Sequence, residues 1–204
     1  MTEQLHCELI SQETVYDLVD RLAAKIRDSG YKPDLVVAIS RGGFTPARVL
    51  CDVLGLFNLT SIRVVHYRKA AVHEQQAYVK YPLCMDIAGQ RILLVDDVND
   101  TGDTLEVARA HLEGLGPTEV RIAVLHEKTG SPVVAEYVAE TLDEWRWLIY
   151  PWAVVEDVGG FLREMTPAPE DAGQAAGWLH ETYGLQLPDS QIERLLSLVR
   201  LGQE

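Results

Sequence analysis

The most distinctive chemistry in the sequence lies between residues 92 and 104, where an apolar stretch leads into carboxylates and a turn. The segment reads Ile-Leu-Leu-Val-Asp-Asp-Val-Asn-Asp-Thr-Gly-Asp-Thr. Its four apolar residues predict a buried strand that ends at Asp96 and Asp97, and open α/β sheets bind ligands at the carboxyl ends of their strands. The Thr-Gly turn then opens a helix near Thr104, whose unpaired N–H groups and positive dipole end favour an anion.

A phosphate site beside several carboxylates requires a ligand that satisfies both, because like charges repel. Hydroxyl groups on the ligand would donate hydrogen bonds to the carboxylates, and a divalent cation would bridge the carboxylates to phosphate. A sugar phosphate that carries further phosphate groups meets both requirements, so we expect a ligand of this kind.

Other readings of the same segment fit the sequence less well. The chain contains neither the G-x-x-x-x-G-K-[ST] motif of nucleoside triphosphatases nor the G-x-G-x-x-G motif of dinucleotide-binding folds. The run Leu-Val-Asp-Asp also resembles the first strand of a receiver domain, which would need a lysine after a later strand, but Lys128 is the last lysine of the chain. A plain solvated acidic turn does not account for the whole thirteen-residue pattern.

The scaffold that positions this segment is predicted by alternating strands and helices. Apolar runs predict buried strands at 34–40, 61–67, 91–98 and 119–128, and amphipathic spacing predicts helices at 12–28, 46–54 and 104–115. This alternation favours an α/β fold with a doubly wound, mostly parallel sheet flanked by helices. The polar stretch 68–88 is long enough for a lid or binding loop. The segment 145–155 is aromatic and β-like, and 178–201 predicts two short helices.

The composition argues against several classes of protein. The chain has 204 residues and a net charge of −13, which argues against a broad nucleic-acid or anionic-membrane surface. Its three cysteines form neither a zinc pattern nor a disulfide framework. The first residues do not resemble a secretory leader, so we expect a cytoplasmic protein with no membrane partner.

Several segments of the sequence together resemble a known family. The segment 92–104 is similar to the phosphoribosyl-diphosphate (PRPP) signature of type I phosphoribosyltransferases, particularly the 6-oxopurine enzymes. Ser40-Arg41-Gly42-Gly43 is similar to the diphosphate loop of this family, and Lys128 matches the lysine directed at the purine O6. Trp147-Leu148-Ile149-Tyr150-Pro151-Trp152 resembles the hood segment of bacterial xanthine-guanine phosphoribosyltransferases. Together the matches span residues 12–165.

The resemblance implies transfer of the 5-phosphoribosyl group of PRPP to N9 of xanthine, guanine or hypoxanthine, with Mg²⁺ as cofactor, in a homodimer or homotetramer. It implies a phosphoribosyltransferase domain over 1–165 with a hood at 145–160, followed by a helical extension at 166–204. Asp100 would be catalytic and Asp97 would lie near the metal. PRPP and phosphate binding would fall to Arg41, Gly42, Asp96, Asp97, Asp100, Thr101, Gly102, Asp103 and Thr104. Lys128, Trp147 and Leu148 would bind the base.

Departures from the family pattern leave alternatives open. Asn99 replaces a residue that is usually apolar, and Asp103 adds a carboxylate where related enzymes often carry Lys or Gly. Asn99 and the unusual tail 166–204 leave a non-purine acceptor as one alternative. A regulatory protein that binds PRPP or a nucleotide without turnover is another. Trp145 rivals Trp147 as the ring that covers the base. Arg68 or Lys69 could contact the diphosphate.

Overall fold

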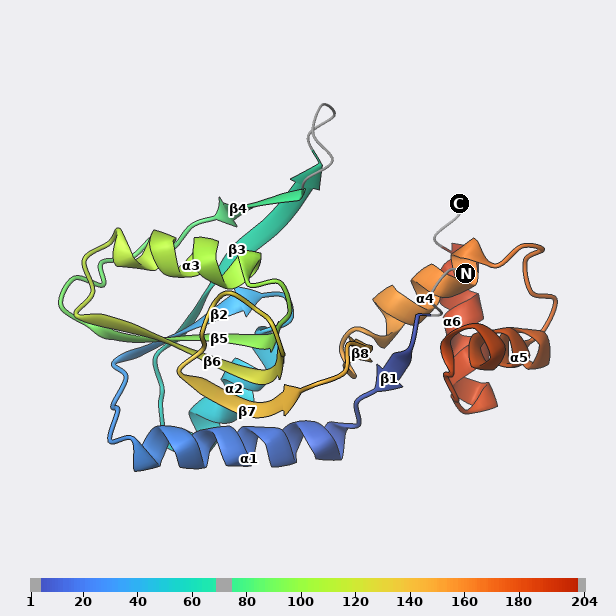
Figure 1. Ribbon diagram of the computed structural model, residues 1–204. Coiled ribbons are helices and arrows are strands. Elements are labelled where there is room, and N and C mark those ends of the chain that lie inside the picture. The colour runs from blue at the N-terminus through green and yellow to red at the C-terminus, as the bar shows by residue number, and fades with distance from the viewer. Residues whose placement is uncertain (1–4, 69–74, 202–204) are drawn as a thin grey trace. The chain divides into compact units, whose positions relative to one another are not determined.

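The computed structural model describes residues 5–68 and 75–201, and the contacts divide the chain into two compact units (Figure 1). One unit is formed by residues 13–145. The other combines residues up to Gln12 with the C-terminal part from Arg146 onward. Within the described residues, no helix has the length and apolar character that a membrane span requires.

The larger unit is built on a sheet that has six strands within the described residues. In chain order they are β2 (Leu35–Ser40), β3 (Leu59–Arg68), β4 (Gln75–Tyr81), β5 (Arg91–Asn99), β6 (Glu119–Lys128) and β7 (Tyr137–Leu142). Their order in the sheet is β4-β3-β2-β5-β6-β7, with β4 antiparallel to β3 and the other neighbours parallel. The chain moves outward from β2 to β3 and later resumes at β5 on the other side of β2. The switch point therefore falls between β2 and β5, where such sheets form a ligand-binding crevice.

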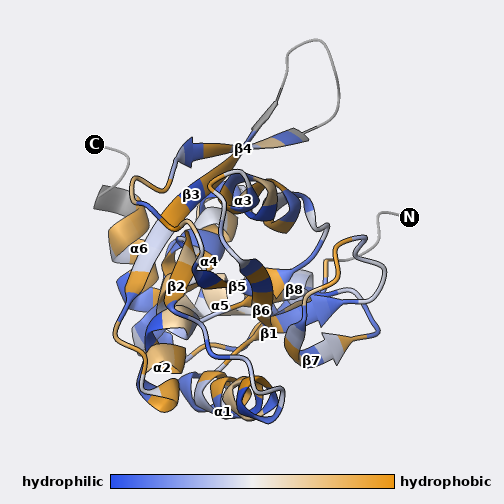
Figure 2. Cartoon of the chain, turned by 90° about the vertical axis from the view of Figure 1, so that its left-hand side faces the viewer, coloured by the Kyte–Doolittle hydropathy of each residue, from blue (hydrophilic) through white to orange (hydrophobic). Residues whose placement is uncertain are grey.

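Three helices cover this sheet: α1 (Gln12–Asp28), α2 (Phe44–Leu54) and α3 (Asp103–Glu113). α3 lies on one side of the sheet, whereas α1 and α2 lie on the other (Figure 1). Side chains alternate between the two faces of a strand, so every second residue of β2 and β5 points toward α3. The resulting core cluster includes Leu35, Val37, Ile39, Leu94, Leu105 and Leu112. α1 and α3 both show apolar and polar residues in alternation (Figure 2), as expected of helices with one buried face.

The smaller unit contains a two-stranded parallel pairing and three helices within the described residues. β1 (Cys7–Leu9) pairs with β8 (Trp147–Ile149). The helices are α4 (Val154–Glu164), α5 (Ala172–Tyr183) and α6 (Asp189–Leu201). They enclose an apolar cluster that includes Ile149, Val158, Leu162, Leu179, Ile192 and Leu195.

The structure confirms the expected α/β fold class, and it corrects the expectation for several segments. The stretch 68–88 is not one long loop, because 75–81 forms β4 at the edge of the sheet. The segment 145–155 contributes only a three-residue strand, and α4 starts at Val154. β7 was not expected. Lys69 lies outside the described residues, as does the side chain of Arg68.

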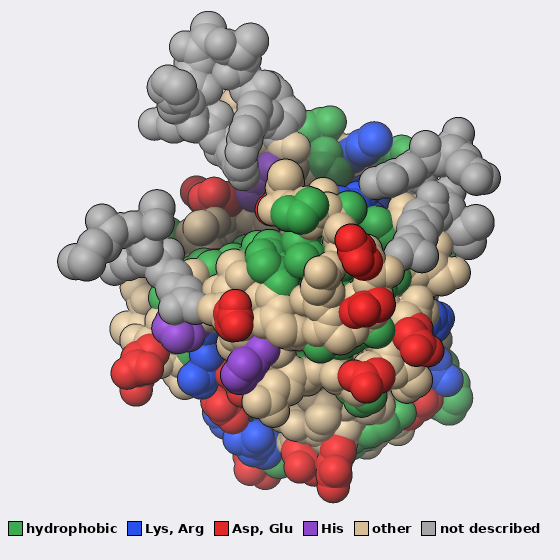
Figure 3. Space-filling view, turned by 90° about the vertical axis from the view of Figure 1, so that its right-hand side faces the viewer, with side chains coloured by type: hydrophobic (Ala, Val, Ile, Leu, Met, Phe, Trp, Pro, Cys, Tyr) green, Lys and Arg blue, Asp and Glu red, His purple; other side chains and the backbone are tan. Residues whose placement is uncertain are grey.

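Carboxylates dominate the charge of the chain, which carries 31 Asp and Glu against 18 Lys and Arg. Figure 3 shows acidic side chains spread over one face of the molecule rather than gathered at one place. An anionic ligand must therefore be bound by donors arranged locally, since the overall field repels it.

A candidate active site at the carboxyl edge of the sheet

The Arg-Gly-Gly turn after β2 lies directly against the carboxylates that end β5. The Gly43 N–H donates to the carbonyl of Ile39 at 2.9 Å, which closes the turn. A Cβ atom on Gly42 would overlap the carboxylate of Asp97, and one on Gly43 would overlap the carbonyl of Val95. Position 43 therefore requires glycine, because its neighbours are backbone atoms, whereas a Cβ at position 42 would force the Asp97 carboxylate to move. The two motifs that the sequence singles out separately, 41–43 and 96–97, meet at the switch point.

Asp96 is the more buried of the two neighbouring carboxylates, with 7% of the residue exposed. Burial raises the pKa of Asp96 well above its usual range, and the adjacent charge of Asp97 raises it further. A hydrogen bond of 3.0 Å from the Asp97 N–H to the Asp96 carboxylate opposes this shift. A group that is costly to ionise yet placed at a ligand edge is typical of functional sites.

The turn after β5 presents backbone N–H groups toward the same edge. Gly102 adopts a φ of +85°, which favours glycine, and its Cβ would come within 2.8 Å of the Val133 side chain. α3 begins at Asp103, and no side chain caps its N-terminus. The residues from Thr101 to Thr104 thus form a short turn whose helix N-terminus favours an anion.

Asn99 has a structural role that its sequence position did not reveal. It is almost fully buried, and its amide donates to Glu127 and to the carbonyl of Val133, both at 2.8 Å. The Ser131 hydroxyl donates to the Asn99 side-chain oxygen at 2.8 Å. Asn99 therefore holds the loop after β6 against the end of β5, and its departure from the family pattern does not itself point to a different ligand.

Lys128 and Asp100 form an ion pair at the same edge. Lys128 Nζ lies 2.7 Å from Asp100 Oδ2, and the Lys128 side chain is only 7% exposed. Trp145 completes the cluster, because Lys128 Nζ lies 4.4 Å from the centroid of its ring. The indole N–H of Trp145 also donates to Asp100 Oδ1 at 3.4 Å. Lys128, expected to bind the base, and Asp100, expected to be catalytic, thus lie together, and Trp145 contacts both.

His66, on β3, contacts Thr104 in the turn that opens α3. Its Nε2 lies 3.0 Å from Thr104 Oγ1. No sequence pattern indicates this contact, because the histidines show no metal-ligand spacing and His66 lies 38 residues before Thr104. Only the packing of α3 against β3 brings the two side chains together.

The remaining predicted residues lie on the turn after β2, on α3 and on β8. Arg41 is exposed at the start of its turn, and its peptide bond to Ser40 is cis. Asp103 is exposed in the first turn of α3. Trp147 is 39% exposed and Leu148 is buried, both on β8 of the smaller unit.

The carboxylates at this edge fit a magnesium ion that also binds substrate. Within the described residues, no group of three or more His, Cys, Asp or Glu side chains forms a metal cage. Mg²⁺ commonly binds through one or two carboxylates together with substrate phosphates. Asp97, a partly exposed hard-oxygen donor beside the Gly42 turn, meets this requirement.

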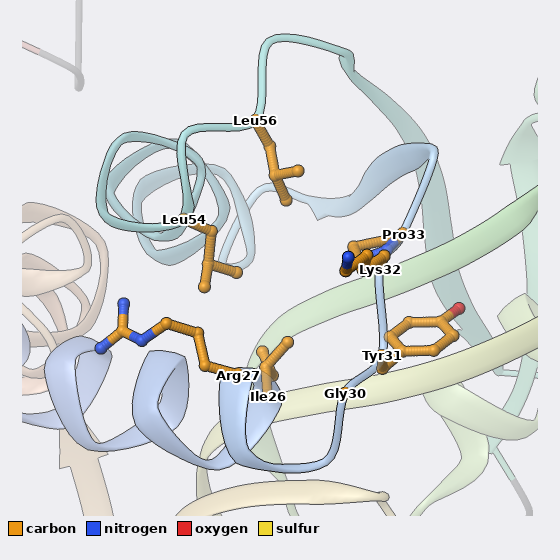
Figure 4. Close-up of a pocket in the computed structure, with 8 residues that line it drawn as sticks. All are labelled: Ile26, Arg27, Gly30, Tyr31, Lys32, Pro33, Leu54 and Leu56. Carbon is orange, nitrogen blue, oxygen red and sulfur yellow. The ribbon is translucent and has the colours of Figure 1, made fainter.

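A separate cavity of about 380 Å³ lies at the opposite end of β2. Ile26 of α1 points toward Leu54 of α2 and Leu56 of the following loop (Figure 4). Residues 30–33, which precede β2, line the remaining wall. Because ligands of such sheets bind at the carboxyl ends of the strands, this cavity is not the candidate active site.

Comparisons with known proteins show the family to which the chain is similar. Residues 8–156 match the phosphoribosyl transferase domain family. The chain is 29% identical over 190 residues to a hypoxanthine-guanine phosphoribosyltransferase of Saccharomyces cerevisiae, a match that covers 71% of this chain and 85% of the relative. A purine phosphoribosyltransferase from Pyrococcus horikoshii has a similar structure, with a TM-score of 0.65, 32% identity, and coverage of 72% of this chain and 94% of that one. A protein from Neisseria gonorrhoeae with bound ppGpp gives a TM-score of 0.64 and 28% identity, covering 74% of this chain and 90% of that one.

Proposed function

This chain belongs to the phosphoribosyltransferase family, and from that premise we propose that it transfers the 5-phosphoribosyl group of PRPP to N9 of a 6-oxopurine, releasing diphosphate. The accepted base would be xanthine, guanine or hypoxanthine, in a purine salvage reaction. The names of the yeast and Pyrococcus relatives support a purine acceptor.

In this proposal the two motifs at the switch point bind PRPP. Asp96 and Asp97 accept hydrogen bonds from the ribose hydroxyls, and Arg41 pairs with diphosphate oxygens while Gly42 lets the backbone approach them. Residues 100–104 bind the 5′-phosphate through the N–H groups that open α3. The overlap that a Cβ on Gly42 would make with Asp97 supports a close arrangement of these groups.

Mg²⁺ is the proposed cofactor, with Asp97 as the residue that would hold it, directly or through water. When bound with PRPP, the ion supplies positive charge against the diphosphate. This requirement follows from the acidic surroundings, since Asp96, Asp97, Asp100 and Asp103 lie along one short segment of a chain with a net charge of −13.

The ion pair between Lys128 and Asp100 supports the assignment of the base site. The Lys128 ammonium would donate to the purine O6, and Asp100 would accept or share the N7 proton as N9 attacks, in a general-base role. Their 2.7 Å contact supports this assignment, because O6 and N7 are neighbouring atoms of one bicyclic base. For Trp147 and Leu148, the support for contact with the base is the match of 147–152 to the family's hood segment.

The single observation that carries the proposal is the meeting of the turn 41–43 with Asp96 and Asp97 beside the N-terminus of α3. The experiment is a spectrophotometric panel of nucleobases with PRPP and Mg²⁺, run on the wild type and on Asp100→Asn as the matched control. We expect turnover with at least one 6-oxopurine and at least a roughly 10²-fold lower turnover in the variant, since general acid–base groups contribute about 10²–10⁴. Preferential use of adenine would contradict the 6-oxopurine assignment.

A further inference from the structure

His66 is a polar residue at the candidate site to which the proposed function assigns no role. Its Nε2 lies 3.0 Å from Thr104 Oγ1, at the start of the helix whose N-terminus faces the proposed phosphate. The contact joins β3 to α3 across a sequence separation of 38 residues. It is therefore a product of the tertiary fold rather than of a local turn.

The packing of α3 on the sheet fixes the direction of the His66 side chain. Val64 belongs to the same buried cluster as Leu105 and Ala108 of α3. Residues two apart on a strand point to the same face, so His66 extends the face of Val64 to the end of β3 that lies beside Thr104. The imidazole is exposed, which leaves it accessible to a ligand at the turn.

The hydroxyl of Thr104 has one hydrogen and two lone pairs, so its partner decides what it offers to an anion. If His66 Nε2 accepted the hydroxyl hydrogen, the oxygen would present only lone pairs to a phosphate. If Nε2 carries a hydrogen and donates it to Oγ1, the hydroxyl hydrogen remains for the phosphate. An anion at this turn therefore selects the form of His66 that donates.

The acidic neighbours make such a donor important. Asp103 lies next to Thr104 in the first turn of α3, and Asp100 precedes it in the same turn segment. The ammonium of Lys128 is paired with Asp100. A phosphate at this turn therefore depends largely on neutral hydrogen-bond donors, namely backbone N–H groups and hydroxyls.

We propose that His66 is a positioning residue that donates from Nε2 to the Thr104 hydroxyl and so aims the hydroxyl hydrogen at a phosphomonoester. The inference rests on the proposed function, because that function places the 5′-phosphate of PRPP, and of the nucleotide product, at residues 100–104.

The test compares ligands with and without the phosphate. Calorimetry would measure the affinities of guanosine 5′-monophosphate and guanosine for the wild type and for His66→Phe, which keeps a ring but removes the donor. One neutral hydrogen bond corresponds to an affinity loss of about three- to tenfold for the monophosphate, with guanosine binding unchanged. His66→Gln, which retains an N–H donor, should restore part of the loss. His180→Phe, at an exposed histidine of α5, is the matched control and should leave both affinities unchanged.

A double-mutant cycle with Thr104→Val separates positioning from direct contact. If His66 acts through Thr104, His66→Phe has no further effect once the hydroxyl is absent. The inference is overturned if His66→Phe lowers the monophosphate affinity equally with and without the Thr104 hydroxyl. It is also overturned if His66→Phe leaves that affinity unchanged, or if the wild type binds no guanosine 5′-monophosphate. A wild type that binds the monophosphate through His66, yet forms no nucleotide from PRPP and any purine, would refute the proposed function and leave this inference standing.

Discussion

Replacing Asp100 by Asn should cost more folding free energy than replacing Lys128 by Met, although both changes break the same ion pair. The two side chains differ in their access to water: the Lys128 side chain is 7% exposed, whereas that of Asp100 is 36% exposed. Asp100→Asn leaves an ammonium in a nearly dry position. Lys128→Met leaves a carboxylate that water can reach, and it fills the space with an apolar side chain of similar length.

The expected magnitudes follow from this asymmetry. Removing one partner of a fully buried ion pair costs about 3–5 kcal/mol, because the other charge is left uncompensated. Since Asp100 is partly solvated, we expect about 2–4 kcal/mol for Asp100→Asn and about 1–2 kcal/mol for Lys128→Met. The double variant should be more stable than the sum of the two losses predicts, by about 1–3 kcal/mol, because its members are in direct contact.

Urea unfolding followed by circular dichroism would measure the three variants against the wild type. Asp143→Asn, a change at an exposed carboxylate of the same unit, serves as the control for loss of a negative charge. Equal losses in the two single variants, or losses that simply add in the double variant, would refute the view that burial of Lys128 makes Asp100 its essential partner.

Three further predictions concern the turn, the buried carboxylate and the aromatic segment. Gly42→Ala should raise the KM for PRPP at least tenfold in steady-state kinetics, because the new Cβ would displace the carboxylate of Asp97, whereas unaltered kinetics would contradict the packing described. Asp96→Asn should raise the free energy of unfolding at neutral pH in the presence of chelator. The raised pKa of Asp96 means that the folded protein binds this proton more tightly than the unfolded chain, so the gain should disappear as the pH falls toward about 4, and a gain independent of pH would contradict this cause. Trp147→Ala should raise the KM for each accepted purine roughly 5- to 150-fold with little change in kcat, since stacking on a base contributes about 1–3 kcal/mol. If Trp145→Ala has this effect instead, Trp145 is the ring that covers the base.

The main features of the site could be predicted from sequence because they lie at the ends of strongly apolar strands. The residues of β5 are buried from Ile92 to Asp96, so their composition alone indicated a central strand that delivers Asp96 and Asp97 to one edge. The turn 41–43 follows another such strand. Parallel strands with helical connections bring their carboxyl ends to one edge, and for this reason the two motifs could be placed together.

Elements with weaker patterns were missed for physical reasons. β4 lies at the edge of the sheet, where Ala77 and Val79 pack against the core cluster and alternate with the exposed Gln76, Tyr78 and Lys80. With so few apolar residues, the segment did not stand out as a strand. α4 contains Gly159 and Gly160, which lower helix propensity, and its stability comes from packing in the cluster of the smaller unit.

Individual side-chain contacts between distant residues could not be predicted from the sequence. His66 meets Thr104 only because α3 packs on β3, and Asn99 meets Ser131 only because β5 and β6 are neighbours. Neither pair has a characteristic spacing. The residue type alone still predicts that a buried asparagine is hydrogen-bonded, although it does not say to which partners.

The most direct test of the central claim is a ³¹P NMR measurement of PRPP incubated with the wild-type protein, Mg²⁺ and guanine, hypoxanthine or xanthine. We expect that, with at least one of these bases, the PRPP signals are replaced by those of diphosphate and a nucleoside 5′-monophosphate in equal amounts. The conversion should require both the base and the metal. PRPP that binds to the protein but keeps its own signals in the presence of every base would contradict the account, and it would favour a protein that senses PRPP without turnover.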